Sequence, residues 1–323
     1  ALSSAASDVY KRQFLESGLY AQALPLKMYY VNAPHFRYEA PQSGRLREHH
    51  QFGMECFGAV EPSADAELIW LVVRLLSDFG LKNLSVRINS IGCPNCRPAY
   101  QKAFREYLAA RKDRLCRTCQ ERMEINPMRT LDCKEEGCKQ ALADAPVMLE
   151  HLCDECRAHF ELLKKYLDEA GIRYAVDARI VRGLDYYTKT VFEVITATPN
   201  GELTVCGGGR YDGLVQELGG PAIPAVGFGM GIERVLMLLD ALEPGECRLQ
   251  MDDETPQVFV ACLGRQLSLN AFSLLRRFRE AGLRADMDHQ ARSLKAQFKY
   301  ADKLGAKYVA VLGDDEIERG VVK

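Results

Sequence analysis

Hydrophobic and polar positions alternate in several short stretches of the chain, as expected for half-buried strands. Elsewhere leucine and valine recur at helical spacing, which predicts amphipathic helices. The strands outnumber the helices in the first three quarters of the chain. Strands are expected over residues 27–39, 49–60, 84–89, 191–196, 202–205 and 225–229, with helices over 65–76 and 230–242.

The pattern changes after an acidic segment over 243–256, which contains Pro244 and Gly245 and is typical of a linker. Beyond it, apolar strands alternate with amphipathic helices, which predicts a small open α/β domain. Its elements are expected over residues 258–263, 268–280, 283–287, 293–304 and 308–312.

The composition of the 323 residues agrees with two or three packed domains, since 47% are hydrophobic. The 42 basic and 44 acidic side chains exclude a uniformly basic nucleic-acid binder, although they allow local basic faces. No apolar run approaches the ~20 residues that cross a bilayer, and no export signal begins the chain. We therefore expect a cytoplasmic protein with no membrane contact. Residues 1–13 are small and polar, and we interpret them as a non-native leader or a frayed end.

Eight of the 12 cysteines form four close pairs, three of them with the CxxC spacing that lets two thiolates reach one tetrahedral ion. Two such pairs can make a four-thiolate zinc site, and the alternative is a set of reduced, partly buried thiols. The sequence does not decide which pairs would share an ion. The pairs are Cys93 and Cys96, Cys116 and Cys119, Cys133 and Cys138, and Cys153 and Cys156.

Candidate binding residues share one face of the strand over 49–60, because alternate residues of a strand point to the same side. His49, Gln51, Gly53 and Glu55 lie at these alternate positions. An amide and a carboxylate beside a bare glycine suit the floor of a polar pocket, while the alternative is a strand with one solvated face.

Arginines in several peptides are candidates for binding anions. Arg37 can hold a phosphate with two parallel hydrogen bonds, or pair with Glu39 on the surface. Arg182 lies before Gly183 and the phenols Tyr186 and Tyr187, in a stretch that also fits an ordinary turn with aromatic anchors.

Two glycine-rich peptides follow. Residues 207–213, GGGRYDG, allow a ligand close to the backbone or make a tight turn, and they match neither a P-loop nor a Rossmann fingerprint. Arg234 lies near the start of a helix, where the helix dipole disfavours a cation unless an anion is bound, and the alternative is a solvated arginine.

The order of these peptides resembles that of one family. Residues 36–53 resemble motif 2 of class II aminoacyl-tRNA synthetases, and residues 227–234, GFGMGIER, resemble motif 3. The peptides VRGLDYY over 181–187 and GGRYDGL over 208–214 are similar to the two signature peptides of histidyl-tRNA synthetases. The α/β tail resembles the anticodon-binding domain of that family.

The resemblance implies an α+β fold in which an antiparallel sheet with flanking helices carries a Cys-rich helical insertion, followed by the open α/β domain. The implied parts are a catalytic core over 14–90 and 178–242, an insertion domain over 91–177, the linker over 243–256, and an anticodon-binding domain over 257–323. Motif 1 of the dimer interface and the end of the last domain are expected to be missing. The chain alone is therefore expected to be weakly active or inactive, and the full-length protein a homodimer.

The resemblance also implies the reaction. The carboxylate of L-histidine attacks the α-phosphate of ATP, which enters with Mg²⁺, and the histidyl-adenylate then passes histidine to tRNA-His. Arg37 and Arg182 would act at the reacting phosphate. ATP would contact Arg37, Glu39, Arg45, His49 and Arg234, with His49 standing where the family usually has a phenylalanine on adenine. Histidine would contact Gln51, Glu55, Arg182, Tyr186 and Tyr187, with Glu55 and Tyr187 on the two imidazole nitrogens. Any zinc would be structural.

A stripe of basic residues in the tail is a candidate for tRNA binding. The residues from 257 to 323 carry 12 basic and 8 acidic side chains, a net charge of +4. A phosphate-tracking stripe and a solvated helix face are both consistent with this spacing. The candidates are Arg292, Lys295, Lys299 and Lys303. Two other functions remain open: a non-catalytic paralogue that regulates ATP phosphoribosyltransferase, and a zinc-stabilised RNA-binding module.

Overall fold

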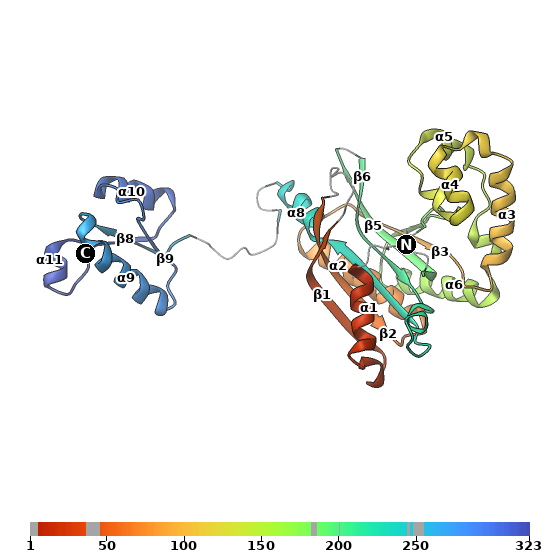
Figure 1. The fold of residues 1–323 in the computed structure, drawn as a ribbon, viewed down its shortest axis with the longest axis horizontal. Helices are drawn as coiled ribbons and strands as arrows, with labels where there is room; N and C mark the ends of the chain where they lie inside the picture. Colours follow the sequence, from red (N-terminus) through yellow and green to blue (C-terminus); the bar gives the residue numbers. More distant parts are fainter. Residues whose placement is uncertain (1–5, 37–45, 182–185, 200, 244–245, 248–254) are drawn as a thin grey trace. The chain divides into compact units, whose positions relative to one another are not determined.

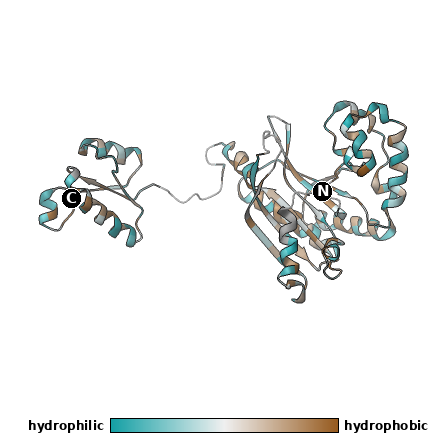
Figure 2. Cartoon of the chain, in the orientation of Figure 1, coloured by the Kyte–Doolittle hydropathy of each residue, from teal (hydrophilic) through white to brown (hydrophobic). Residues whose placement is uncertain are grey.

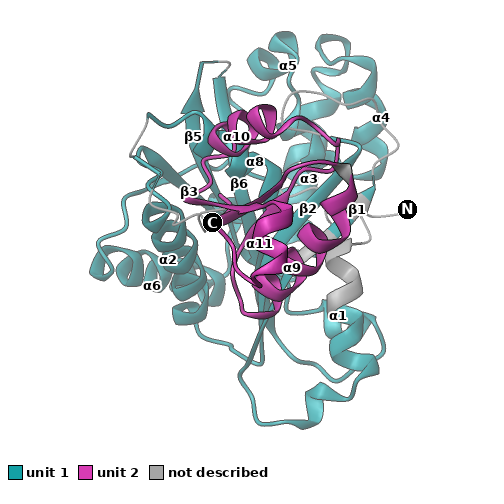
Figure 3. Cartoon of the chain, turned by 90° about the vertical axis from the view of Figure 1, so that its left-hand side faces the viewer, with its two compact units in different colours: residues 1–248 teal, residues 249–323 magenta. Residues whose placement is uncertain are grey.

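The protein divides into two compact units, residues 1–248 and residues 249–323, which are considered separately (Figure 3). The structure is a computed structural model. It describes residues 6–36, 46–181, 186–199, 201–243, 246–247 and 255–323. Among these residues, no helix is long and apolar enough to cross a membrane.

A seven-stranded sheet forms the centre of the first unit, in the order β1-β2-β7-β6-β5-β3-β4 (Figure 1). Neighbouring strands are antiparallel except β3 and β4. This sheet and its flanking helices confirm the predicted α+β class. The strands are β1 (Leu26–Phe36), β2 (Glu48–Phe57), β3 (Leu84–Ser90), β4 (Tyr174–Val176), β5 (Thr188–Thr198), β6 (Gly201–Arg210) and β7 (Ala225–Gly231).

Helices bury one face of this sheet. The helices α2 (Pro62–Asp78), α6 (Asp154–Glu169) and α8 (Ile232–Asp240) supply apolar residues that pack with those of the strands into one hydrophobic cluster. The strands contribute Phe192, Phe228 and their even-numbered neighbours. The odd-numbered residues of β2 and β7 therefore point to the opposite face. Near the opposite face a second cluster includes residues of α1 (Ala6–Glu16) and α7 (Leu214–Glu217).

An insertion leaves the sheet after β3 and returns to it at β4, which lies beside β3. It contains α3 (Arg97–Ala109), α4 (Arg117–Ile125), α5 (Glu136–Ala141) and the first turns of α6. Its helices carry both hydrophilic and hydrophobic residues (Figure 2). Tyr100, Phe104 and Leu108 pack in its small core together with four buried cysteines. Cysteine side chains are therefore a substantial part of the core of the insertion.

Two segments differ from the sequence-based expectation. Of the two alternatives for the glycine run, a turn between elements is wrong, because residues 207–209 lie within strand β6. Gly208 and Gly209 have no room for a side chain, since Phe192 and Tyr187 fill that space. Helix α1 covers residues 6–16, where a leader outside the fold was expected over 1–13, and the side chain of Lys11 is buried. The origin of residues 1–13 stays a prediction.

A buried ion pair connects the start of α2 to the end of β6. Arg210 and Asp65 both have fully buried side chains, and the Nε of Arg210 lies 3.2 Å from each carboxylate oxygen of Asp65. The guanidinium of Arg210 also donates to the carbonyl oxygens of Ala59 and Glu61 and to the carboxylate of Asp212. Arg210, the arginine of the glycine-rich peptide over 207–213, is thus held by buried partners and does not face the solvent.

The second unit has a three-stranded parallel sheet in the order β10-β8-β9. Its strands and helices follow the predicted alternation, with one additional short helix after the last strand. They are β8 (Val258–Cys262), α9 (Ser268–Glu280), β9 (Ala285–Met287), α10 (Leu294–Lys303), β10 (Tyr308–Leu312) and α11 (Asp314–Glu318).

Candidate active site

The open face of the central sheet has a floor of glycines. Gly227 lies opposite Glu55, Gly229 lies opposite Gly53, and Gly209 of β6 lies opposite Gly227. A methyl group on Gly53 would overlap the ring of Tyr30, and one on Gly227 would overlap the carboxylate of Glu55. The glycines therefore let large side chains from neighbouring strands lie flat against the backbone.

A buried carboxylate lies at one end of this floor. Glu55 is 4% exposed, and the hydroxyl of Tyr211 donates a hydrogen bond to its Oε2. Burial, reinforced by the nearby negative charge of Glu55, raises the pKa of both Tyr211 and Tyr30 above the usual value of a phenol. Both phenols therefore stay protonated and can act as donors near neutral pH.

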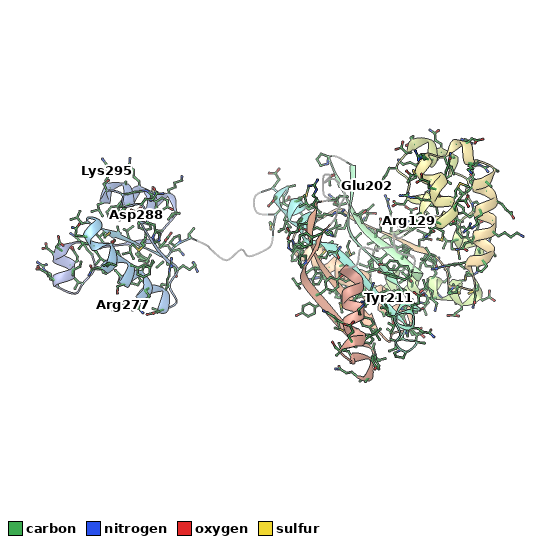
Figure 4. The ribbon with its side chains drawn as sticks, viewed as in Figure 1. Arg129, Glu202, Tyr211, Arg277, Asp288 and Lys295 are labelled. Carbon is green, nitrogen blue, oxygen red and sulfur yellow. The ribbon has the colours of Figure 1, made fainter. Side chains whose placement is uncertain are left out.

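Aromatic rings surround this carboxylate. The rings of Tyr186 and Tyr187 lie 4.8 Å apart, and the ring of Tyr211 lies 5.7 Å from that of Tyr186 and 6.4 Å from that of Tyr187. Tyr211 follows strand β6 (labelled in Figure 4). The ammonium group of Lys11 donates to the hydroxyl of Tyr186 at 2.7 Å and lies 4.2 Å from the centre of the Tyr211 ring. The pocket thus already accommodates a cationic nitrogen on an aromatic wall.

Polar groups mark the other end of the floor. Gln51 lies opposite Gly231, and the aliphatic part of Arg234 passes beside Gly231. The guanidinium of Arg234 donates to the carbonyl oxygen of Thr204. Gln51 and Glu55 are four residues apart on one strand, so roughly 13 Å separates the two ends of the floor. That length suits an extended ligand with an aromatic end and an anionic end.

Glu233 fixes the strand at this second end. Its carboxylate accepts hydrogen bonds from the backbone N–H of His50 at 2.8 Å and from the ring Nδ1 of His50 at 2.6 Å. Burial raises the pKa of Glu233, but these hydrogen bonds outweigh it, and the net shift is downward. Glu233 is thus a carboxylate that holds the backbone between His49 and Gln51, two of the candidate residues.

The structure brings some of the candidates together and does not describe others. Gln51, Glu55, Tyr186 and Tyr187 surround the glycine floor, Arg234 borders its far end, and His49 lies further along β2. Arg37, Glu39, Arg45 and Arg182 lie outside the described residues. The expected positions of Arg37 and Arg182 at the reacting phosphate, with Arg234 as a further contact of ATP, therefore stay a prediction.

Comparisons with known proteins identify the family of the chain. The sequence profile described as "Histidyl-tRNA synthetase" matches residues 15–235, which include the whole glycine floor. The chain belongs to the histidyl-tRNA synthetase family. A second profile, described as "Anticodon binding domain", matches residues 257–323.

Two bacterial members of the family illustrate the similarity. The chain is 53% identical over 312 residues to the histidine–tRNA ligase of Caldanaerobacter subterraneus subsp. tengcongensis, covering 97% of this chain and 74% of that protein. It is 51% identical over 318 residues to the histidine–tRNA ligase of Clostridium perfringens, covering 97% of this chain and 73% of that protein. The chain thus spans about three quarters of the length of these relatives.

Solved structures share the fold. Apo histidyl-tRNA synthetase from S. aureus has a TM-score of 0.76 at 36% identity, covering 98% of this chain and 76% of that one. A Bacillus halodurans protein described as an ATP phosphoribosyltransferase regulatory subunit/histidyl-tRNA synthetase has a TM-score of 0.58 at 21% identity, covering 94% of this chain and 77% of that one. The second similarity concerns the fold alone.

Two residues of the pocket escaped the sequence reasoning. Tyr30 lies on β1 opposite Gly53. A register shift between Tyr30 and Ala33 interrupts the alternation of β1, so counting alternate residues along this strand does not place Tyr30 on the pocket face. Tyr211 is part of the second signature peptide, and the signal for it was its position two residues after the glycine run over 207–209. Tyr30 lies near Glu55 because β1 pairs with the next strand, β2, whereas Tyr211 comes from the end of β6, which is distant from β2 in sequence.

The eight paired cysteines form two groups, each able to hold a metal ion. Cys93 and Cys96 meet Cys153 and Cys156, while Cys116 and Cys119 meet Cys133 and Cys138. Within each group all four sulfur atoms lie within 4.8 Å of one another. The first pair along the chain thus joins the fourth, and the second joins the third, which the sequence left undecided.

The candidate tRNA-binding residues of the second unit differ in their surroundings. Lys295, Lys299 and Lys303 are exposed on α10, and Figure 4 labels Lys295 there. Arg292 is instead half-buried, its Nη1 lies 2.6 Å from Oδ1 of Asp288, and its guanidinium lies over the ring of Tyr300. The three lysines therefore offer charge to a ligand, whereas Arg292 already has a carboxylate partner.

Proposed function

We propose that the chain activates L-histidine with ATP and transfers it to tRNA-His. Relatives named histidine–tRNA ligase, about half identical over nearly the whole chain, support this assignment. The observation that carries it is the buried carboxylate of Glu55 among phenols on a glycine floor. This arrangement suits a small ring that has hydrogen-bonding groups on two sides.

Recognition of histidine would rest on pairing both imidazole nitrogens. A site that hydrogen-bonds polar groups of its substrate rejects analogues without them, because its own buried polar groups are then left unpaired. Glu55 would accept from one nitrogen and Tyr187 would contact the other. Tyr211 supports this role, since its hydroxyl already orients the carboxylate of Glu55. Tyr186 would line the ring pocket, and Gln51 would hold the amino-acid backbone.

Activation needs no nucleophile from the protein. An oxygen of the histidine carboxylate bonds to the α-phosphorus of ATP as the bond from that phosphorus to the bridging oxygen breaks, and pyrophosphate leaves with the electron pair. Catalysis is then positioning together with neutralisation of charge at phosphorus. Arg37 and Arg182 would act there, and Arg234 at the outer phosphates. ATP enters with Mg²⁺ on its phosphates, which offsets part of their charge.

The remaining nucleotide contacts follow from position. Glu39 and His49 would lie at the adenine, with the imidazole of His49 able to stack on the base, and Arg45 would lie beside the phosphates. In the second step a ribose hydroxyl at the 3′ end of tRNA attacks the adenylate carbonyl, and AMP leaves. The exposed lysines Lys295, Lys299 and Lys303 would contact tRNA phosphates, and the homodimer of the full-length protein stays a prediction.

Zinc is the ion that we propose for both cysteine groups. Four cysteine sulfurs are the ligand set of structural zinc, which fills all four positions of a tetrahedron. With Zn–S bonds of about 2.3 Å, the sulfurs of such a tetrahedron lie ~3.8 Å apart. Three of the observed separations are 3.6, 3.9 and 3.8 Å, for Cys93–Cys96, Cys93–Cys153 and Cys116–Cys133. The residues therefore fit the ion.

The regulatory-subunit alternative receives less support. A protein of that description shares the fold at 21% identity, whereas named ligases reach 53% identity. The match of residues 257–323 to an anticodon-binding profile also favours a function that involves tRNA.

Exchange of labelled pyrophosphate into ATP tests the proposed function. We expect exchange that depends on histidine and on no other amino acid. A chain that bound tRNA but showed neither histidine-dependent exchange nor histidine binding by calorimetry would be an RNA-binding module. Exchange supported by a different amino acid would contradict the assignment of the pocket.

Replacing Gly227 with alanine is expected to weaken histidine binding about tenfold. The added methyl needs space that the carboxylate of Glu55 occupies, and overpacking of this kind costs ~1–3 kcal/mol. Titration calorimetry with histidine measures the effect. Gly137→Ala is the matched control, because Gly137 lies in α5 and a methyl there meets no atom within 4 Å. Affinity as high in Gly227→Ala as in Gly137→Ala would contradict the prediction.

A further inference from the structure

We propose that the first cysteine group, Cys93, Cys96, Cys153 and Cys156, positions the histidine pocket through the hydrogen-bonding residues next to it, whereas the second group mainly holds the fold of the insertion. The inference rests on the proposed function, since it concerns the affinity for histidine. It assigns different roles to two sites that have the same ligands.

The segment that carries Tyr187 is held from outside the sheet. Lys189 adopts a φ of 49°, in the left-handed region that few residues other than glycine occupy. Its backbone N–H donates to the carbonyl oxygen of Gly92 at 2.8 Å, and its carbonyl oxygen accepts from the N–H of Ile91 at 2.8 Å. Because a strained residue persists only where its surroundings enforce it, these contacts set the course of the chain beside Tyr187.

These backbone bonds, and two further side-chain contacts, come from residues that lie within two positions of a cysteine of the first group. Gly92 precedes Cys93, and its own φ of 64° brings the chain to that cysteine. Arg97 follows Cys96, and its guanidinium donates to the carbonyl oxygens of Ile91 and Tyr187. Glu155 lies between Cys153 and Cys156, and its Oε1 lies 2.8 Å from the Nζ of Lys189.

The four sulfurs thus join the two helices that supply these contacts. Cys96 immediately precedes α3, and Cys153 immediately precedes α6. The backbone N–H of Cys153 also donates to the sulfur of Cys96 at 3.1 Å, a type of hydrogen bond that supports a metal-bound thiolate. An ion held by all four sulfurs would fix the starts of both helices, and with them Arg97 and Glu155.

Among the described residues, the second cysteine group differs in the kind of contact: Met128, between its two pairs, packs against the hydrophobic cluster of Tyr187, but no hydrogen bond or ion pair found beside its cysteines reaches Lys189 or Tyr187. The hydrogen bonds recorded around it stay within the insertion: the N–H of Cys116 donates to the sulfur of Cys138, and Tyr107 donates to the carbonyl oxygen of Ala141. The second group therefore serves as a matched internal control for the first.

Zinc content and histidine affinity together test the proposal on the whole chain. The unsubstituted chain is expected to contain two zinc ions by mass spectrometry, and Cys96→Ser and Cys119→Ser one each. The dissociation constant for histidine should rise at least fivefold more in Cys96→Ser than in Cys119→Ser. Hydrogen exchange of the peptide over 187–192 should accelerate in Cys96→Ser and not in Cys119→Ser.

A second pair of variants leaves every cysteine in place. Arg97→Lys retains the charge but loses the two-pronged guanidinium, and it is expected to keep two zinc ions while histidine affinity falls about tenfold, the usual effect of losing a charge-assisted hydrogen bond. Arg105→Lys, at an exposed position of the same helix, is its control. If Cys96→Ser fails to fold, the comparison of histidine affinity between Arg97→Lys and Arg105→Lys still tests the proposal.

Several results would overturn the proposal. These are a chain without zinc or with iron in its place, equal histidine affinity in Cys96→Ser and Cys119→Ser, or equal affinity in Arg97→Lys and Arg105→Lys. Failure of the proposed function is separate: if the unsubstituted chain binds no histidine, zinc content and hydrogen exchange of the 187–192 peptide still distinguish the two cysteine groups.

Discussion

Glu55→Gln is expected to lower kcat/KM for histidine in pyrophosphate exchange by about 10³-fold. Glu55 is buried and its Oε2 accepts from the phenol of Tyr211, and in the proposed function its carboxylate would also accept from the substrate ring. Glutamine has nearly the same shape but offers one acceptor and one donor group. One buried donor is then left without an acceptor, and mismatches of this kind in a polar site discriminate by 10⁴ or more in favourable cases.

The loss should fall mainly on histidine and not on ATP. We therefore expect KM for ATP to change less than threefold while KM for histidine rises steeply. Glu67→Gln is the control, since Glu67 pairs with Lys27 on the surface and is about half exposed. A Glu55→Gln variant with wild-type KM for histidine would show that the imidazole binds elsewhere.

Asp65→Asn is expected to destabilise the first unit by about 3–5 kcal/mol. The substitution leaves the guanidinium of Arg210 buried without its principal counter-charge, and breaking a buried pair from one side costs this much. Asp212 compensates only in part, because its carboxylate is partly exposed and lies 3.2 Å from Arg210. The start of α2 and the end of β6 then lose their common anchor.

Unfolding in urea, followed by the fluorescence of Trp70, measures this effect. Trp70 is the only tryptophan of the chain and lies on α2, so its signal reports the first unit. Asp78→Asn is the control on the same helix, where Asp78 forms an exposed pair with Arg74 and is expected to contribute less than ~1 kcal/mol. Equal midpoints for the two variants would mean that the buried pair adds nothing to stability.

The sequence predicted the pocket floor and two of its aromatic residues, Tyr186 and Tyr187, but not Tyr30 and Tyr211. The alternation of β2 depends only on neighbouring residues, and it placed Gln51, Gly53 and Glu55 on one face, as the structure has them. Tyr211 reaches Glu55 through pairings between strands distant in sequence, and Tyr30 lies on the neighbouring strand β1, where a register shift interrupts the alternation. Periodicity does not carry that information.

The glycine run over 207–209 shows a different limit. Glycine favours turns because it tolerates unusual backbone angles, which predicts a break in the chain at this run. Here the glycines continue a strand, and what selects them is the space taken by Phe192, Phe228 and Tyr187. A sequence pattern shows where glycine gives the backbone conformational freedom. It does not show which bulky side chains folding brings next to that glycine.

Which cysteine pairs come together could not be predicted from the local sequence either. Four close pairs allow several combinations, and the choice depends on how the insertion folds back. The sheet makes that choice, because β3 and β4 lie side by side and bring the first and last pairs together.

The position of the first cysteine group has a consequence for the evolution and stability of the insertion. Its sulfurs join residues 57 and 60 positions apart, so that an ion bound there would close the intervening chain into a ring at its base. Closing such a ring removes much of the entropy that an excursion of this length would otherwise cost the folded state. With the ion bound, the insertion could change in length, or unfold at its outer end, while the central sheet stays folded.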